Sequence, residues 1–262
     1  MIATHGGVIS GISSDRLPVD AGPPIFAFSL NRKLRQTYQG EYFRYRQASG
    51  GEFDYPSNTP NLSEDVFITT IYDQSIGYGV QHAVQPTESL QPKLELVGSE
   101  YRAVFDQQEY LDVPSLGESS GVSELGQDFT ITARSDGDVA TSPVIGIWSG
   151  SDVISIKPSN ATTRFEFNTT HTILNNDGQS TQYICKVDKA QNNNRVLTIR
   201  TENTHGHVVI GDQTPTFENI SIGRDNQGYY KGKFTEATLH LGNLTSRGSD
   251  QILSTTRTHY GN

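Results

Sequence analysis

The sequence predicts an all-β protein, folded as an antiparallel sandwich of two sheets that follows an extended N-terminal arm. Strand-like runs recur at short spacing from residue 66 onward, clusters of Gly, Asn and Asp separate them, and no long helical period intervenes. The 12 Tyr and 11 Phe supply large core side chains, although the hydrophobic fraction is only 34%. A length of 262 residues fits one large β domain that buries most of its apolar surface.

Residues 1–24 differ in composition from the rest of the chain. Met1–Ser10 is rich in small and β-prone residues, and Asp15–Pro24 is typical of an extended linker. Pro23 and Pro24 cannot continue a helix and favour polyproline geometry. Residues 1–24 therefore form either an arm that joins a neighbouring subunit or a disordered leader. We predict the arm, followed by one sandwich domain over residues 25–262.

Between the arm and residue 66 the sequence predicts a short helix, a strand and a turn. Phe28, Leu30 and Leu34, with basic residues between them, predict a helix within Ile25–Tyr38. The alternation in Tyr42–Arg46 predicts a strand. Asn58–Asp65 carries turn and capping signals.

The remaining strands follow from alternating or apolar runs bounded by turn residues. They are Val66–Tyr72, Lys93–Val97, Arg102–Phe105, Tyr110–Val113, Phe129–Ala133, Val144–Trp148, Val153–Ile156, Thr163–Phe167, Gln182–Val187, Val196–Arg200, His207–Ile210, Ile220–Ile222 and Lys233–Leu241. No repeat period is visible, which argues against a propeller. After the last strand, Thr245 or Ser246 can cap a short helix whose Ile252 and Leu253 would pack under the sheet.

The segment Val66–Ser75 places polar groups at the end of a buried strand. Its alternation directs Val66 and Ile68 to one face and Asp73 to the other. Asp73 and Gln74 can therefore fix a loop by accepting and donating backbone hydrogen bonds, and Asp106 follows another strand in the same way. We expect a structural role for all three residues, with ligand or ion binding by Asp73 as the alternative.

Charge and composition exclude several classes of partner. The net charge of −9 argues against nucleic acid and anionic membranes, which require a concentrated positive face. No run approaches the roughly 18 apolar residues of a membrane span. The sequence does not open with a cationic and then an apolar segment, so we expect no secretory signal. Cys185 is the single cysteine, and its apolar run predicts a buried, inert thiol.

The acidic residues do not predict a catalytic pair. A retaining glycosidase needs two carboxylates about 5–5.5 Å apart. The candidates are Asp73, Asp106, Glu109, Asp112, Glu218, Asp225 and Glu236. No Ser/His/Asp order, phosphate-binding loop or CxxC pair is present, which removes support for acyl transfer, nucleotide hydrolysis and disulfide exchange. We therefore expect no catalytic residue.

Metal ligands are also not predicted. Ser135–Asp138 and Asp225–Gly228 offer oxygen atoms in tight turns, but neither has the alternating acidic pattern of a calcium loop. His205 and His207 lack a nearby third ligand. We therefore expect no metal ion and no cofactor.

Exposed aromatic rings are the groups on which sugars stack. The candidate glycan-contacting residues are Tyr229 and Tyr230, in an expected loop, and Trp148. For Trp148, the flanking isoleucines favour a ring that points into the sandwich over one that meets a sugar.

Eight short segments form an ordered set along the chain. They are Phe28–Leu34, Tyr42–Arg46, Thr69–Ser75, Gln91–Lys93, Phe105-Asp106, Tyr110-Leu111, Gly232–Glu236 and Leu244-Thr245. Taken in order, they resemble a jelly-roll sandwich module of the concanavalin A-like and laminin-G-like type. This module is widespread in tailed-phage structural proteins, and it is also similar to the catalytic fold of arabinofuranosidase B. The resemblance covers residues 26–255, with Ile76 standing where glycine is usual.

The resemblance implies a non-enzymatic virion subunit: a tail, baseplate, fibre-linked or capsid-decorating protein. Its expected partners are further copies of itself, with a trimer as the first expectation, and other virion proteins, and a host surface glycan is a further candidate. The alternatives are a glycoside hydrolase of arabinofuranosidase type and a soluble carbohydrate-binding lectin. The vicinal cysteine pair of that enzyme family cannot form from Cys185 alone. We therefore predict that the chain is not an enzyme.

Overall fold

The structure is a computed structural model that describes residues 18, 24–75, 80–106, 108–113, 128–137, 142–159, 162–175, 181–189, 194–201, 204–211, 218–242 and 244–260. Nearly all of the predicted arm, residues 1–24, lies outside these ranges. The role of the arm and the domain boundary after it therefore stay predictions.

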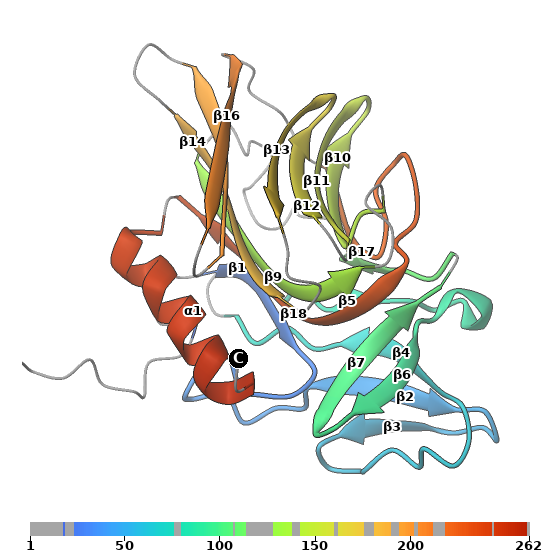
Figure 1. The fold of residues 1–262 in the computed structure, drawn as a ribbon. Helices are drawn as coiled ribbons and strands as arrows, with labels where there is room; N and C mark the ends of the chain where they lie inside the picture. Colours follow the sequence, from blue (N-terminus) through green and yellow to red (C-terminus); the bar gives the residue numbers. More distant parts are fainter. Residues whose placement is uncertain are drawn as a thin grey trace, which may run out of the picture.

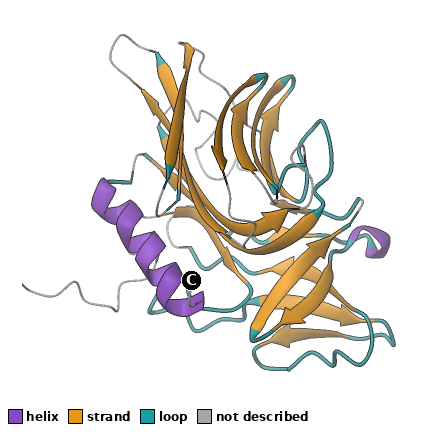
Figure 2. Ribbon diagram, in the orientation of Figure 1, coloured by secondary structure: helices purple, strands orange, loops and turns teal. Residues whose placement is uncertain are grey.

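The described chain is an antiparallel β-sandwich with one long helix, as predicted (Figures 1 and 2). We call its first layer the cavity sheet. Its strands, in the order of their pairing, are β8 (Leu111–Val113), β17 (Asn219–Ile222), β10 (Ile145–Ser149), β11 (Asp152–Pro158), β12 (Thr162–Phe167) and β13 (Thr170–Asn175).

The second layer, the central sheet, is strongly bent in Figure 1. Its strands, again in pairing order, are β1 (Pro24–Ser29), β18 (Gly232–Leu241), β9 (Phe129–Gly137), β14 (Thr181–Lys189), β15 (Arg195–Arg200) and β16 (His205–Gly211). One hydrophobic core, which includes Ile147 and Phe165 from the cavity sheet and Ile131 and Leu239 from the central sheet, lies between the layers.

A smaller set of strands continues the sandwich at one end. It contains β2 (Phe43–Gln47), β3 (Glu52–Tyr55), β4 (Val66–Ile71), β5 (Ala83–Val84), β6 (Lys93–Val97) and β7 (Glu100–Phe105), with the short 3-10 helix η2 (Glu88–Leu90). Strand β7 pairs with β18 of the central sheet and β5 pairs with β8 of the cavity sheet. These pairings join the set to both layers.

The helix α1 (Ser246–Tyr260) begins where the sequence predicts and runs for 15 residues. The Gly248 amide donates to the Thr245 hydroxyl at 3.1 Å, which is an N-cap hydrogen bond. Ile252 and Leu253 form a small buried cluster with Ile184 and Leu244, so the helix packs on β14 as expected. No helix among the described residues is long and apolar enough to cross a membrane.

The predicted helix within Ile25–Tyr38 is wrong. Pro24–Ser29 is instead strand β1, whose Phe26 and Phe28 pair with Leu239 and Ala237 of β18. All six residues of β1 are buried, so both of its faces are shielded from solvent. A strand of this kind lacks the polar alternation that identifies a half-buried strand.

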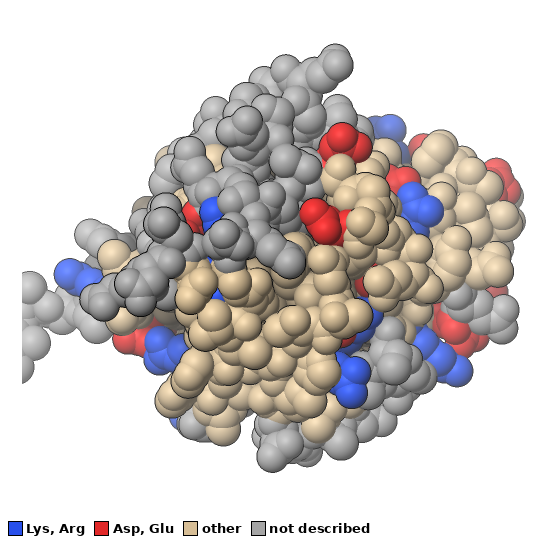
Figure 3. Space-filling view, turned by 90° about the horizontal axis from the view of Figure 1, so that it is seen from above, with Lys and Arg blue, Asp and Glu red and all other residues tan. Residues whose placement is uncertain are grey.

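Charged residues are interspersed on the surface. In the view from above, Lys and Arg alternate with Asp and Glu around the edge of the described part, with uncharged residues between them (Figure 3). Such mixing leaves no broad field of one sign on the part of the surface drawn in that view.

A buried ion pair ties α1 to the central sheet. Arg32, after β1, donates to both carboxylate oxygens of Glu236 on β18, at 2.8 and 2.6 Å. Thr256 and Tyr260 of α1 bond the same pair, and the Arg134 guanidinium lies 4.1 Å from the centre of the Tyr260 ring. Burial alone would raise the pKa of Glu236, but the attraction and hydrogen bonds of Arg32 hold it below its usual value.

The end of strand β4 is fixed by a second polar network. The Asp73 carboxylate accepts the amides of Ala27, Ser75 and Gln81 at 2.9, 2.8 and 3.0 Å, and the Ser75 hydroxyl at 2.7 Å. Gln74 accepts the Leu34 amide at 2.7 Å through its side-chain oxygen. Both side chains therefore hold the loops beside β1 in place. Burial raises the pKa of Asp73 in spite of these hydrogen bonds.

The substitution Glu236→Gln should lower the free energy of unfolding by about 3–5 kcal/mol, because it leaves the buried Arg32 without a charged partner. Since the pKa of Glu236 is depressed, its contribution is present above the usual value of 4.5 and is lost as the pH falls through the folded pKa. Urea unfolding at pH 7 and at pH 3 measures both effects. The exposed Glu88→Gln is the control, and an equal loss in both variants would contradict the argument.

The substitution Asp73→Ala should lower the free energy of unfolding by about 1–3 kcal/mol, because buried amide donors lose their acceptor. Asp106→Ala is the matched control, since the Asp106 side chain is 68% exposed. Thermal melting of both variants checks this expectation. An Asp73→Ala protein with an unchanged melting temperature would show that the network adds no stability.

Candidate functional site

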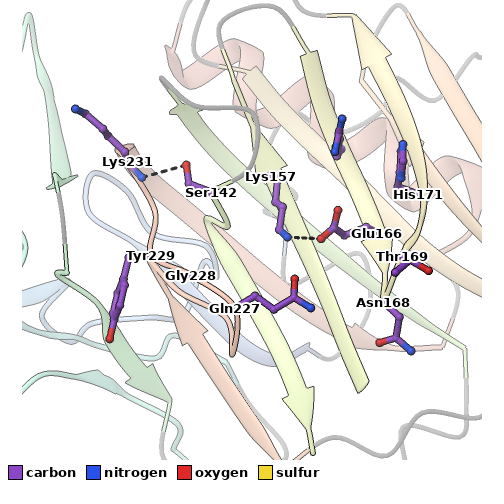
Figure 4. A pocket seen from close by; sticks show the side chains of 11 residues that line it. Ser142, Lys157, Glu166, Asn168, Thr169, His171, Gln227, Gly228, Tyr229 and Lys231 are labelled. Atoms are coloured by element: carbon purple, nitrogen blue, oxygen red, sulfur yellow. Dashed lines mark hydrogen bonds and ion pairs between the residues drawn. The ribbon is translucent and has the colours of Figure 1, made fainter. Parts of the chain in front are cut away.

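A cavity opens on the face of the cavity sheet that points away from the core. Its volume is about 640 Å³, within the range of small-molecule sites. In Figure 4, Lys157 points toward Glu166, while Tyr229 and Lys231 stand on the opposite wall. The lining residues are Ser142, Lys157, Arg164, Glu166, Asn168, Thr169, His171, Gln227, Gly228, Tyr229 and Lys231.

The two-residue period of the strands places the charged groups in this cavity. On β11, Ile154 and Ile156 enter the core, so Lys157 belongs to the opposite face. On β12, Phe165 and Phe167 enter the core, which leaves Glu166 on that same face. A polar floor therefore lies directly behind an apolar core.

Lys157 is held between two carboxylates. Its ammonium forms a hydrogen-bonded ion pair with Glu166 and lies 3.5 Å from Asp225 Oδ2. The side chains of Lys157, Glu166 and Asp225 are 8%, 10% and 0% exposed, so both interactions are shielded from water. Glu166 reaches the cavity wall, whereas Asp225 lies behind Lys157.

The loop from Gly223 to Lys231 forms one wall of the cavity. Asp225 Oδ1 accepts the amides of Gln227 and Gly228 at 2.7 and 2.9 Å, which closes a tight turn. The loop lies directly on Gly146 of β10, where an added Cβ would come within 2.3 Å of the Arg224 carbonyl oxygen. The absence of a side chain at Gly146 therefore lets Asp225 reach Lys157.

Three aromatic rings and one guanidinium lie close to one another beside the cavity. The Arg224 guanidinium lies 3.6 Å from the centre of the Tyr110 ring and 5.7 Å from that of Trp148. Tyr229 lies 6.2 Å from Tyr110 between ring centres. Asp112 binds Arg224 through both carboxylate oxygens at 2.9 Å, which fixes the guanidinium in this stack.

The structure separates the three candidate glycan-contacting residues. Tyr229 is 42% exposed and lines the cavity. Tyr230 is fully buried and donates its hydroxyl to the Asp136 carbonyl, so its selection as a sugar contact is wrong. Trp148 is half-buried on the face of β10 opposite to Ile147, so it does not point into the core as favoured from the sequence.

The acidic candidates are scattered over the structure. Asp73 and Gln74 belong to the strand-end network described above, and Glu236 belongs to the ion pair with Arg32. Asp106 is exposed at the rim, where its carboxylate lies 3.6 Å from Lys231; it does not hold a loop as expected. The others are Glu109, which accepts the Asp106 amide, Asp112 with Arg224, and exposed Glu218. Asp225 is the one of these seven that contacts Lys157.

Glu166 was missed in the sequence reasoning, and so was Lys157. The signal was present in Arg164–Phe167, where charged and aromatic residues alternate. An alternating strand sends its charged residues to one face, so two charged residues in one buried strand indicate a polar face.

A second, smaller cavity of about 330 Å³ adjoins the first. Its lining includes Phe67, Lys93, Lys233 and Asp136, and it shares Lys231 with the main cavity. Within the part of the chain that the structure describes, no group of three His, Cys, Asp or Glu side chains could hold a metal ion.

No family model matches the chain, and no curated protein matches its sequence. Solved structures do match. An arabinofuranosidase in complex with arabinofuranosyl-α-1,2-xylobiose superimposes with a TM-score of 0.65 and 15% identity, over 91% of this chain and 63% of that one. A GH54 α-L-arabinofuranosidase soaked with a cyclic sulfate inhibitor gives 0.63 and 14%, over 91% and 64%. Domains LG4-5 of the mouse laminin α1 chain give 0.39 and 10%, over 87% and 89%.

The similarity to the two arabinofuranosidase structures supports the predicted sandwich fold. The chain spans less than two thirds of the length of the arabinofuranosidases that it matches, with 63% and 64% covered. The prediction that it is not an enzyme is contradicted, because this fold at a TM-score of 0.65 is that of a glycoside hydrolase. Nothing in the comparisons indicates a virion protein. The virion location, the homo-oligomer and the host glycan therefore stay predictions.

Proposed function

We propose that the chain binds a carbohydrate in the main cavity and hydrolyses a glycosidic bond there. The observation that carries the proposal is Glu166, a carboxylate on the wall of a 640 Å³ cavity with a shielded ammonium beside it. The overlap of 91% of the chain with an arabinofuranosidase supports the reaction class. We therefore select α-L-arabinofuranosides as the first substrates to test.

Glu166 has the chemistry that the transition state of glycoside cleavage requires. That transition state resembles an oxocarbenium ion, so an ionised carboxylate near the anomeric carbon stabilises it. The Lys157 ammonium forms an ion pair with Glu166 and holds its carboxylate in place. In the proposed first step, Glu166 attacks the anomeric carbon as the bond from that carbon to the leaving oxygen breaks.

His171 is the group placed to supply the proton that the leaving oxygen needs. It is the register partner of Glu166 on β13, it is exposed, and it lines the cavity. Directly opposed residues on adjacent strands have their Cβ atoms about 4.5–5.5 Å apart. In the second step, neutral His171 takes a proton from water, whose oxygen attacks the anomeric carbon and releases Glu166.

Asp225 acts as a positioning residue. Its side chain is fully buried behind Lys157 and cannot touch a sugar. It offsets part of the Lys157 charge and fixes the ammonium through the turn at Gln227 and Gly228.

The substitution Glu166→Gln should lower kcat by about 10²–10⁴-fold and preserve sugar binding, because the amide keeps the shape and removes the charge. The measurement is release of 4-nitrophenol from a panel of nitrophenyl glycosides that includes the α-L-arabinofuranoside. Glu218→Gln, at an exposed glutamate beside β17, is the control. A wild-type protein that binds sugars without turning over any glycoside would contradict the hydrolase and leave a carbohydrate-binding site.

The substitution His171→Asn should slow hydrolysis of an arabinosyl oligosaccharide by about 10²-fold or more, because a sugar leaving group needs a proton. Nitrophenolate leaves without one, so the loss in kcat/KM, which reports the first step and not the later attack of water, should be much smaller for the nitrophenyl glycoside. The comparison of the two substrates checks the role, with His205→Asn on exposed β16 as the control. Equal losses on both substrates would exclude His171 as the proton donor.

A further inference from the structure

The main cavity gathers positive charge in an acidic protein. The chain has a net charge of −9, yet the lining includes Lys157, Arg164 and Lys231 against the single acidic side chain of Glu166. The charge of this lining is opposite in sign to the net charge of the protein, so it is a local property of the cavity.

Two of the three cations already have partners. Lys157 is bound by Glu166 and lies near Asp225. Lys231 lies 3.6 Å from Asp106, but both side chains are more than half exposed. An exposed pair of this kind contributes roughly 0–1 kcal/mol, so Lys231 stays free to meet a ligand.

Arg164 has neither an ion pair nor a hydrogen bond to its side chain among the residues described. It is partly exposed on β12, and its register partner on β11 is Lys157. Because Glu166 and Asp225 already bind Lys157, Arg164 is the cation of this strand pair that no described carboxylate neutralises.

We propose that Arg164 binds the carboxylate of an acidic sugar, with Lys231 adding positive charge from the opposite wall, so that the ligand of this cavity is a glycan that contains uronic acid residues. A guanidinium presents a planar fork of donors that matches a carboxylate through two parallel hydrogen bonds. Tyr229, exposed on the cavity wall that carries Lys231, offers a ring face for the sugar. The inference rests on the proposed function only in taking the ligand to be a carbohydrate.

Calorimetric titration of the full chain tests the inference without any need for turnover. The probes are an oligogalacturonide and the same oligosaccharide with its carboxyl groups reduced to alcohols. We expect the acidic form to bind at least about 10-fold tighter at low salt, with the advantage falling as salt rises. Arg164→Gln should remove the advantage, whereas Arg200→Gln, which removes a cation of β15 paired with Asp250, should keep it.

Equal affinity for the acidic and reduced forms would overturn the inference, and so would an Arg164→Gln protein that melts like wild type and keeps the preference. A sulfated neutral oligosaccharide that binds tighter than the uronide would overturn the choice of carboxylate. Preference for the uronide without turnover of any glycoside supports the inference and contradicts the hydrolase. Turnover of neutral arabinosides, together with equal affinity for the acidic and the reduced probe, supports the hydrolase and contradicts the inference.

Discussion

The cavity exists because alternate residues of the strands in the cavity sheet face the core. Ile154 and Ile156 on β11 and Phe165 on β12 must face the core, and the two-residue period then sends Lys157 and Glu166 to the other face. The carboxylates of Glu166 and Asp225 lie beside the shielded ammonium of Lys157 and compensate its charge. The alternation of side chains along β11 and β12 therefore produces both the apolar core and the charged cavity wall.

Two shielded ion pairs have different tasks in this protein. Arg32 and Glu236 join residues 204 positions apart and connect α1 to the central sheet. Lys157 and Glu166 are neighbours on adjacent strands, and their ion pair forms part of the cavity wall. Breaking either pair leaves a shielded charge, which costs more than the intact pair contributes. The first pair contributes to the fold, and the second sets the charge of the site.

The sandwich, most of its strands and the cap of α1 at Thr245 could be predicted from short-range pattern and turn chemistry. Strand β1 could not, because a strand buried on both faces has no polar alternation to distinguish it from a helix. Glu166 could not be identified from pairs of carboxylates, because its partner is a lysine, Lys157, on the adjacent strand. Tyr230 was misplaced because adjacent residues in a loop, Tyr229 and Tyr230, have opposite burial.

The fold alone does not assign a function, because function resides in the site. What distinguishes this cavity is the arrangement of its charges. Asp225 and Glu166 bind Lys157, so the ammonium holds a carboxylate in place and adds little free positive charge. Arg164 on the neighbouring strand then supplies a positive charge that the described protein does not neutralise. A ligand that completes this arrangement must bring its own negative charge, and an acidic sugar would do so while placing its ring near Glu166 and Tyr229.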